Sequence, residues 1–313
     1  MKKLFFIACF MGMGSIPTLS FAAGEKLVLS VESLATPYEV TMRNAAVAHA
    51  KKIGVPLLAL DGQNNSLKQV SDIENAITGG AQAFIVSPND ADAVASGIDA
   101  VAAAGLVVVT MDRQANTKHK VPHFGVDFYK GGVLSGEVIK KNFPNGADII
   151  VLTGQLGASS NIDRYRGFMD SLKKGGDKYR IIAEQSGNWF RSEGLRIVES
   201  LLPTLPKVPD VIYAMNDDMA LGAIEALQTA GYKPGQVFVS GQNADPEALA
   251  RVRDGWLSVT YDLQQGHGVS VAIDQVLDYL RNKTPIKGLM ITPMTITKDN
   301  LKEAAQYANI DNY

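Results

Sequence analysis

Short runs of β-branched, apolar residues alternate with helix-like segments along nearly the whole chain, and this alternation restricts the fold more than any other feature. In the first half such runs lie at 27–31, 55–60, 83–86 and from 107 onward, and a helix is expected over 89–105. The connections are too short for neighbouring strands to pair antiparallel across a helix. The pattern therefore predicts an α/β fold with a doubly wound parallel sheet built from right-handed β-α-β units.

A second series of the same kind follows and ends in an expected strand over 289–295. The stretch 212–218 leads through an alanine-rich helix to Gly231, much as 84–90 leads to Gly105. This internal similarity predicts two lobes of like topology joined by a hinge. The expected lobes are 23–126 with a return at about 263–290, and 127–262 with about 291–313.

Two helix starts are predicted from capping patterns. Thr36 is expected as an N-cap, with Pro37 in the first turn and Glu39 closing a capping box. Ser66 and Gln69 form a second such pair. On this interpretation Glu39 is a capping acid rather than a ligand contact.

The chain of 313 residues, with 46% hydrophobic residues and a net charge of −2, is long enough for two cored lobes. No basic stripe with interleaved aromatic residues is present, so nucleic acid and anionic membranes are not expected as partners. Lys2 and Lys3, an apolar run over 4–13 and small residues near Ala22 indicate a cleaved secretory signal over 1–22, and hence an exported protein.

The only cysteine, Cys9, lies inside the expected signal, so the mature chain is expected to lack disulfides and thiol nucleophiles. A lipoprotein signal ending at Cys9 is the alternative, but too little hydrophobic sequence precedes it. The run over 4–13 is also too short for a membrane span, which needs about 20 residues.

The strand that begins at Val107 ends abruptly in Asp112 and Arg113. The carboxyl ends of parallel strands face the ligand crevice in open α/β sheets, so this pair stands where binding groups are expected. A solvated ion pair worth under about 1 kcal/mol is the plainer alternative. Other strands also end in polar residues, including Asn216, which is equally suited to cap the following helix. The repetition favours a shared ligand site.

The strand ends and adjoining loops combine planar hydrogen-bonding groups with aromatic rings. Carboxylates and carboxamides can each engage two adjacent hydroxyl groups, and arginine offers forked donors. Aromatic rings cover the apolar C–H faces of a sugar. The set therefore predicts a monosaccharide or polyol site. Its members are Glu32, Thr36, Tyr38, Asp112, Arg113, Arg164, Phe190, Asn216 and Asn243.

Helical spacing limits this set. Arg164 and Arg166 lie two residues apart on an expected helix, so at most one of them faces the cleft. One of the neighbouring aromatic residues Trp189 and Phe190 is expected in the core. No Gly-x-Ser-x-Gly elbow and no histidine pair with metal-ligand spacing is present, and the Gly-rich stretch 154–157 lacks the remaining residues of a P-loop. No catalytic residue, metal or cofactor is therefore expected.

Several motifs carry a resemblance to a known family. They are Leu-Asp-Gly-Gln-Asn-Asn at 60–65, Thr-Met-Asp-Arg-Gln at 110–114, Asn-Asp-Asp-Met-Ala-Leu-Gly-Ala at 216–223 and Leu-Gln-Thr-Ala-Gly at 227–231. Over nearly the whole mature chain, the sequence resembles the ribose-type periplasmic sugar-binding proteins of ABC importers. The resemblance implies sugar contacts at Asp112, Arg113, Arg164, Phe190 and Asn216, and an aromatic stacking on the ring at Tyr38.

Five positions depart from that family's ribose binders. Those proteins usually have a small hydroxyl residue where this chain has Glu32, an Asn at Thr36 and a second aromatic residue at Glu39. They also have an Asp at Asn243 and a Gln near Leu263. The resemblance therefore implies a monosaccharide or polyol without implying ribose. The additional acids at Glu32 and Glu39 would also admit an amino-bearing ligand.

The expected function is ligand capture between the lobes by a monomer, followed by docking of the closed form to the membrane permease of an ABC importer. A sensor that presents the closed form to a chemoreceptor is one alternative. An exported carbohydrate-active enzyme is another. Lactose-repressor-type regulators share the two-lobed core, but they carry an N-terminal helix-turn-helix where this chain has the expected signal.

Overall fold

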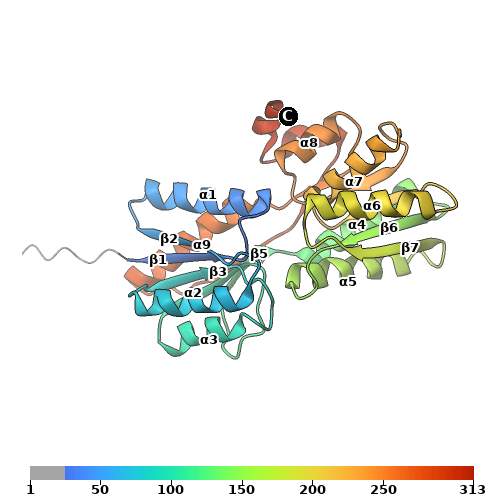
Figure 1. Cartoon of the computed structure of the whole chain (residues 1–313). Coiled ribbons are helices and arrows are strands. Elements are labelled where there is room, and N and C mark those ends of the chain that lie inside the picture. The colour runs from blue at the N-terminus through green and yellow to red at the C-terminus, as the bar shows by residue number, and fades with distance from the viewer. Residues whose placement is uncertain (1–24) are drawn as a thin grey trace, which may run out of the picture.

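The structure is a computed structural model that describes residues 25–313. Two α/β lobes lie side by side (Figure 1). The expected signal segment 1–22 and Cys9 lie outside the described residues. None of the helices within 25–313 is both long and apolar enough to cross a membrane.

The first lobe is built on a six-stranded, all-parallel sheet. In sheet order the strands are β11 (Leu289–Ile291), β5 (His123–Val126), β4 (Val107–Asp112), β3 (Ala83–Val86), β1 (Leu27–Val31) and β2 (Leu57–Asp61). Helices cover both faces, as Figure 1 shows. They are α1 (Pro37–Lys52) and α9 (Gln265–Asn282) on one face, and α2 (Ser66–Thr78) and α3 (Ala95–Ala103) on the other.

Alternation along β1 shows why this sheet is covered on both sides. Leu27 and Leu29 are buried with α1 and α9, in a cluster that includes Met42 and Ile273. Val28 points to the opposite face, where it belongs to a separate cluster with the α2 and α3 side chains. Successive side chains of a strand point to opposite faces, so a continuously apolar strand needs a helical layer on each.

The second lobe contains a four-stranded parallel sheet. Its order is β7 (Tyr179–Ser186), β6 (Ala147–Thr153), β8 (Val211–Ala214) and β9 (Phe238–Ser240). The helices are α4 (Phe128–Asn142) packed on α5 (Ser159–Lys173), α6 (Arg191–Leu201) packed on α7 (Asp217–Thr229), and α8 (Pro246–Arg253). The α/β fold class expected from the sequence is thereby confirmed.

The chain passes between the lobes at three short connections. These join β5 to α4, β10 (Thr260–Asp262) to α9, and β11 to β12 (Met294–Ile296), which pairs antiparallel with β10. The single strand expected over 289–295 is therefore wrong, because β11 and β12 belong to different sheets. Pro293 lies between them and has no N–H to continue a strand ladder. The final 3-10 turns, Lys298–Glu303 and Tyr307–Asn312, pack on the second lobe's core.

Two further predictions of helix starts are wrong. The helix expected from residue 89 begins only at Ala95, because Asp90 Oδ1 accepts the backbone N–H groups of Asp92 and Ala93 and holds a turn. The α2 helix is capped by Asn65, which accepts the N–H of Lys68, rather than by the expected residue 66.

The Gln69 side chain, expected in that second cap, instead lies buried between strands. Its amide donates to Ser30 Oγ at 3.1 Å and to the Ser87 carbonyl at 2.8 Å, while its Oε1 accepts the N–H of Asn89. Gln69 thus ties the loop after β3 to the neighbouring strand β1, close to where the loops of the two lobes meet.

Close contact between α4 and α5 requires a glycine at 132, because a Cβ there would overlap the carbonyl oxygen of Arg164. We expect Gly132→Ala to lower the free energy of unfolding by about 1–3 kcal/mol, as overpacked interiors do. Gly97→Ala in α3 is the control: its Cβ would meet neighbours at ordinary distances, so stability should be unchanged or rise by up to about 1 kcal/mol. Urea unfolding followed by circular dichroism measures both, and equal stability of the two variants would contradict the packing argument.

Candidate functional site

A cavity lies between the lobes at the carboxyl ends of both parallel sheets, where α/β folds place ligands. The first lobe contributes the start of α1 and the end of β4. The second contributes α5 and the loops that precede α6, α7 and α8. The space not filled by protein atoms, with its mouth included, is about 300 Å³. The lining residues are Thr36, Tyr38, Glu39, Asp112, Arg113, Ser160, Arg164, Trp189, Asn216 and Asn243.

A buried ion pair supports the first-lobe wall. Glu32, directly after β1, lies behind Arg113 and does not itself line the cavity. Its Oε1 is 2.6 Å from Arg113 Nη2, and its Oε2 accepts the hydroxyl of Ser87 at 2.8 Å. Both partners of the pair are less than 10% exposed. Glu32 therefore fixes the Arg113 guanidinium from the side away from the cavity.

Asp112 is held in a similar way by its neighbours. Its Oδ1 accepts the hydroxyl of Tyr38 at 2.5 Å, and its Oδ2 lies 3.9 Å from Arg113 Nε. Burial and the nearby Glu32 carboxylate raise the pKa of Asp112, while Arg113 and the Tyr38 hydroxyl act in the opposite direction. Tyr38 is thus engaged through its hydroxyl group.

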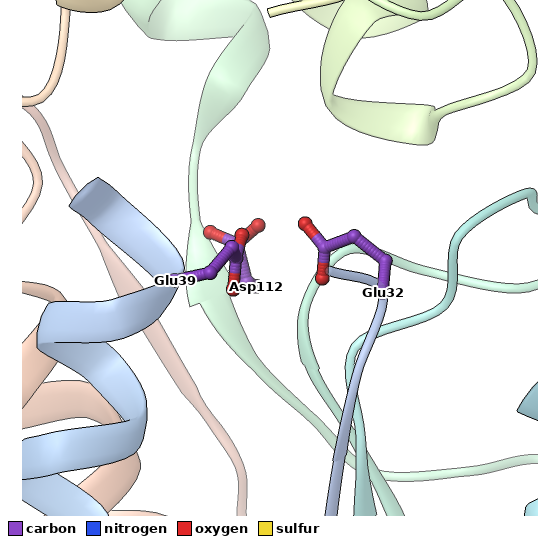
Figure 2. Close-up of side chains that lie close together, drawn as sticks. All are labelled: Glu32, Glu39 and Asp112. Carbon is purple, nitrogen blue, oxygen red and sulfur yellow. The ribbon is translucent and has the colours of Figure 1, made fainter. Parts of the chain in front are cut away.

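A third carboxylate completes this wall. Figure 2 shows the carboxylates of Glu39 and Asp112 close together, with that of Glu32 turned toward them, and oxygens of all three lie within 4.8 Å of one another. Burial, followed by repulsion from the Glu32 carboxylate, raises the pKa of Glu39 well above its ordinary value. The prediction that Glu39 closes a capping box is wrong: Thr36 makes no side-chain capping bond, and Glu39 is buried against the cavity.

The second-lobe wall contributes a cation and aromatic surface. Arg164 Nη1 donates to the carbonyl of Met215 at 2.7 Å, and its guanidinium lies 4.5 Å over the ring of Phe128 and 5.5 Å from that of Trp189. Arg166, by contrast, is on the exposed side of α5 and pairs with Asp163. Of the two arginines, therefore, only Arg164 lines the cavity.

Asn216 serves both of the roles considered from the sequence. Its Oδ1 accepts the N–H of Met219 at 3.0 Å and so caps α7, while its Nδ2 donates to the carbonyl of Trp189 at 2.9 Å. It also lines the cavity together with Asn243, whose Nδ2 donates to Asp245 Oδ2. Side chains that are tied to their own loops in this way present a preorganised surface.

Three of the residues that line the cavity have positive φ angles, although none of them is glycine. The values are 59° for Asp112, 73° for Trp189 and 133° for Asn243. Such conformations are strained for L-residues and concentrate at ligand sites, where surrounding contacts hold them in place.

The structure brings seven of the nine predicted site residues to one cavity. They are Thr36, Tyr38, Asp112, Arg113, Arg164, Asn216 and Asn243. Glu32 supports the wall from behind. Phe190 does not line the cavity, whereas its neighbour Trp189 does. The sequence reasoning left out Glu39, Ser160 and Trp189. The adjacent aromatic residues at 189 and 190 indicated that one ring would face the cleft. The positive φ of Trp189, which the sequence does not reveal, is associated with the ring that does so.

Several buried polar atoms of the lining residues have no hydrogen-bond partner within the described chain. They are Arg113 Nε, Arg164 Nε, Trp189 Nε1 and Glu39 Oε2. Buried polar atoms are normally paired, so this grouping around one cavity needs an explanation. A small polar molecule with both donors and acceptors would pair with these atoms.

The chain matches the model of the periplasmic binding protein domain over residues 27–284. The chain belongs to the periplasmic binding protein family. A ribose import binding protein of Salmonella typhimurium is 33% identical to this binding protein over 281 residues, 88% of this chain and 93% of the relative. The Caulobacter myo-inositol binding protein, solved with myo-inositol bound, shares 36% identity with a TM-score of 0.88, and the match covers 92% and 97% of the two chains.

The Glu32–Arg113 pair lies entirely within the first lobe of this binding protein, so its effect on stability can be separated from lobe closure. We expect Glu32→Ala to lower the free energy of unfolding by about 3 kcal/mol, because it leaves a buried guanidinium without its main partner. Glu193→Ala, which breaks an exposed i,i+3 pair with Arg196, should lower it by less than about 1 kcal/mol. Urea unfolding compares the two, and equal losses would argue against a buried pair.

Proposed function

We propose that this protein captures a monosaccharide or related polyol in the interlobe cavity and delivers it to the permease of an ABC importer from the periplasm. The observation that carries the proposal is the set of unpaired buried donors and acceptors around one small cavity. Hydroxyl groups both donate and accept, so a ring bearing several of them pairs with Arg, Trp and Glu atoms at once. The relatives named for ribose import and the neighbour with bound myo-inositol support the same ligand class.

The cavity also offers aromatic surface for the C–H faces of a sugar ring. Trp189 and Tyr38 place aromatic carbon along a cavity that is otherwise polar. Faces of a sugar ring that carry only C–H groups are poorly hydrated and gain from contact with aromatic rings. The forked donors of Arg113 and Arg164 approach from opposite lobes, so a bound ring would contact both lobes together.

Direct contacts between the lobes indicate how ligand binding is coupled to closure. The N–H of Ala91 in the first lobe donates to the carbonyl of Gly157 in the second at 3.1 Å, and the N–H of Gln114 donates to Ser159 Oγ at 2.8 Å. Gln155 Nε2 donates to Asn89 Oδ1 at 3.1 Å. A ligand held by both walls stabilises this closed arrangement through its higher affinity for it.

A glycosidase mechanism fits the geometry less well. Glycoside hydrolysis uses two carboxyl groups that flank the scissile bond. The two carboxylates that line this cavity, Glu39 and Asp112, lie on the same wall, within 4.8 Å of each other. Among the lining residues of the second lobe none carries a carboxylate. The geometry therefore supports binding, in agreement with membership of a binding-protein family.

Asp112→Asn tests the role of the carboxylate without introducing a residue that disfavours positive φ, since Asn tolerates that region. We expect affinity for the best ligand from a panel of pentoses, hexoses and inositols to fall about 10- to 100-fold, the loss of a hydrogen bond to a charged group. Calorimetry measures this, with exposed Asp177→Asn as the control of equal charge change. No binding by the unmodified protein to any panel member would count against the function itself.

Gly157→Ala tests closure without altering the ligand-binding wall. A Cβ at 157 would overlap Asp90 Oδ2 across the interlobe contact. We expect about a tenfold loss of affinity, because the closed form must shift to accommodate the methyl group. Small-angle scattering should show a smaller ligand-induced decrease in the radius of gyration than in the unmodified protein. Gly97→Ala, which packs within one lobe, should change neither quantity.

A further inference from the structure

The acidic first-lobe wall narrows the class of ligand, and this inference rests on the proposed function. Two carboxylates, Glu39 and Asp112, line the cavity, and a third, Glu32, lies directly behind. Glu39 is 3% exposed, and its Oε2 has no partner within the described chain. A neutral sugar requires no such concentration of buried acid. A ligand that brings its own positive charge would be stabilised by it.

The cations of the site do not pair directly with every acid of this wall. Three carboxylates converge there, while the site contains two guanidinium groups and no lysine among its lining residues. Arg113 is directed to Glu32 at 2.6 Å, and its closest approach to Asp112 is 3.9 Å. Arg164 lies on the opposite wall, where its Nη1 is bonded to the Met215 carbonyl. Glu39 therefore has no directly paired cation.

We propose that the cavity binds an amino-bearing monosaccharide or cyclitol, whose protonated amino group lies between the carboxylates of Glu39 and Asp112. An ammonium group has three donors and no acceptor, which matches adjacent carboxylate oxygens. The hydroxyl groups of the same ring face Arg113, Arg164 and Trp189. The acid wall thus selects the amine and the remaining walls hold the polyol.

The ionisation of Glu39 supports this assignment. The charged and titratable groups around it are Glu32, Asp112, Arg113 and Tyr38. Burial and Glu32 raise the pKa of Glu39 well above its ordinary value, because both favour the protonated form of this carboxyl group. A bound ammonium group stabilises the carboxylate, and the Glu39 proton passes to solvent. Binding of an amine that is already protonated is therefore coupled to proton release from Glu39.

A divalent cation would use the same oxygens, since they lie within 4.8 Å of one another. The Arg113 guanidinium, however, is in contact with Glu32 and would repel a metal ion at that position. An ammonium group on a ligand needs only the two carboxylates that line the cavity. The geometry therefore favours the amine over a bare metal ion.

Calorimetry on matched pairs of compounds tests the proposal. The pairs are glucosamine with glucose, galactosamine with galactose, and scyllo-inosamine with scyllo-inositol. We expect at least one amine to bind 10-fold or more tightly than its hydroxyl partner at pH 7. Titrations in phosphate and in Tris, which differ in ionisation enthalpy, should show net proton release for that amine and none for its partner. Neutral compounds that bind while every amine binds equally or more weakly would overturn the inference and leave the proposed function standing. Binding by neither series would overturn both.

Glu39→Gln tests whether the Glu39 carboxylate is responsible for the preference for amines. The ratio of amine affinity to hydroxyl affinity should fall at least 10-fold, and proton release should be lost. Glu74→Gln, the same change at an exposed position on α2, should leave the ratio unchanged. An unchanged ratio in Glu39→Gln would contradict the proposal. Calcium alone should not shift the melting temperature of the unmodified protein, and a rise reversed by EDTA would assign the acids to a metal instead.

Discussion

The buried contact between Glu32 and Arg113 is the interaction on which the rest of the site depends. Arg113 follows a strand that ends at positive φ, and without a fixed partner its long side chain would have several orientations at the lobe interface. Glu32 holds it from behind, and Ser87 in turn holds Glu32. Hydrogen bonds to the remaining atoms help to offset the desolvation of a buried charge pair, and the Ser87 hydroxyl supplies one of them to Glu32 Oε2.

The ion pair also determines how the other acids behave. Burial and the Glu32 carboxylate raise the pKa values of Glu39 and Asp112, and Arg113, which is committed to Glu32, offsets these increases only in part. The wall therefore carries less negative charge than its three carboxyl groups would have at their ordinary pKa values. Its protonation state depends on what occupies the cavity, since a neutral ligand and a cationic ligand stabilise different forms of Glu39.

Much of the fold and most of the site followed from the sequence, because both depend on local patterns. Continuous apolar strands separated by helices require a covered parallel sheet, and the carboxyl ends of such strands converge whatever the details of the loops. That reasoning placed Asp112, Arg113, Arg164 and Asn216 at one site, which the structure also does.

The features that sequence reasoning missed depend on backbone geometry or on partners distant along the chain. Glu39 had the spacing of a capping acid, but its burial is set by its contact with Glu32 and Asp112 across the fold. Of the adjacent residues Trp189 and Phe190, only Trp189 lines the cavity. Its φ of 73° is a backbone feature that the sequence does not reveal. Gln69 bonds to strand residues far away in sequence, which no local pattern reveals.

Closure of the lobes removes water from the carboxyl groups of the first-lobe wall, Glu39, Asp112 and Glu32, and so links closure to their charge. In an open molecule the carboxylates of the first lobe are hydrated, and closing the second lobe over them removes that water at a substantial cost unless the charge is neutralised or paired. Protonation of Glu39 offsets part of this cost, and a ligand that supplies donors to both carboxylates offsets more of it. The contacts at Ala91, Gln114 and Gly157 join the two lobes but do not solvate the acids. The free energy that drives closure must therefore come largely from the ligand, which makes the closed form a signal that the cavity is occupied.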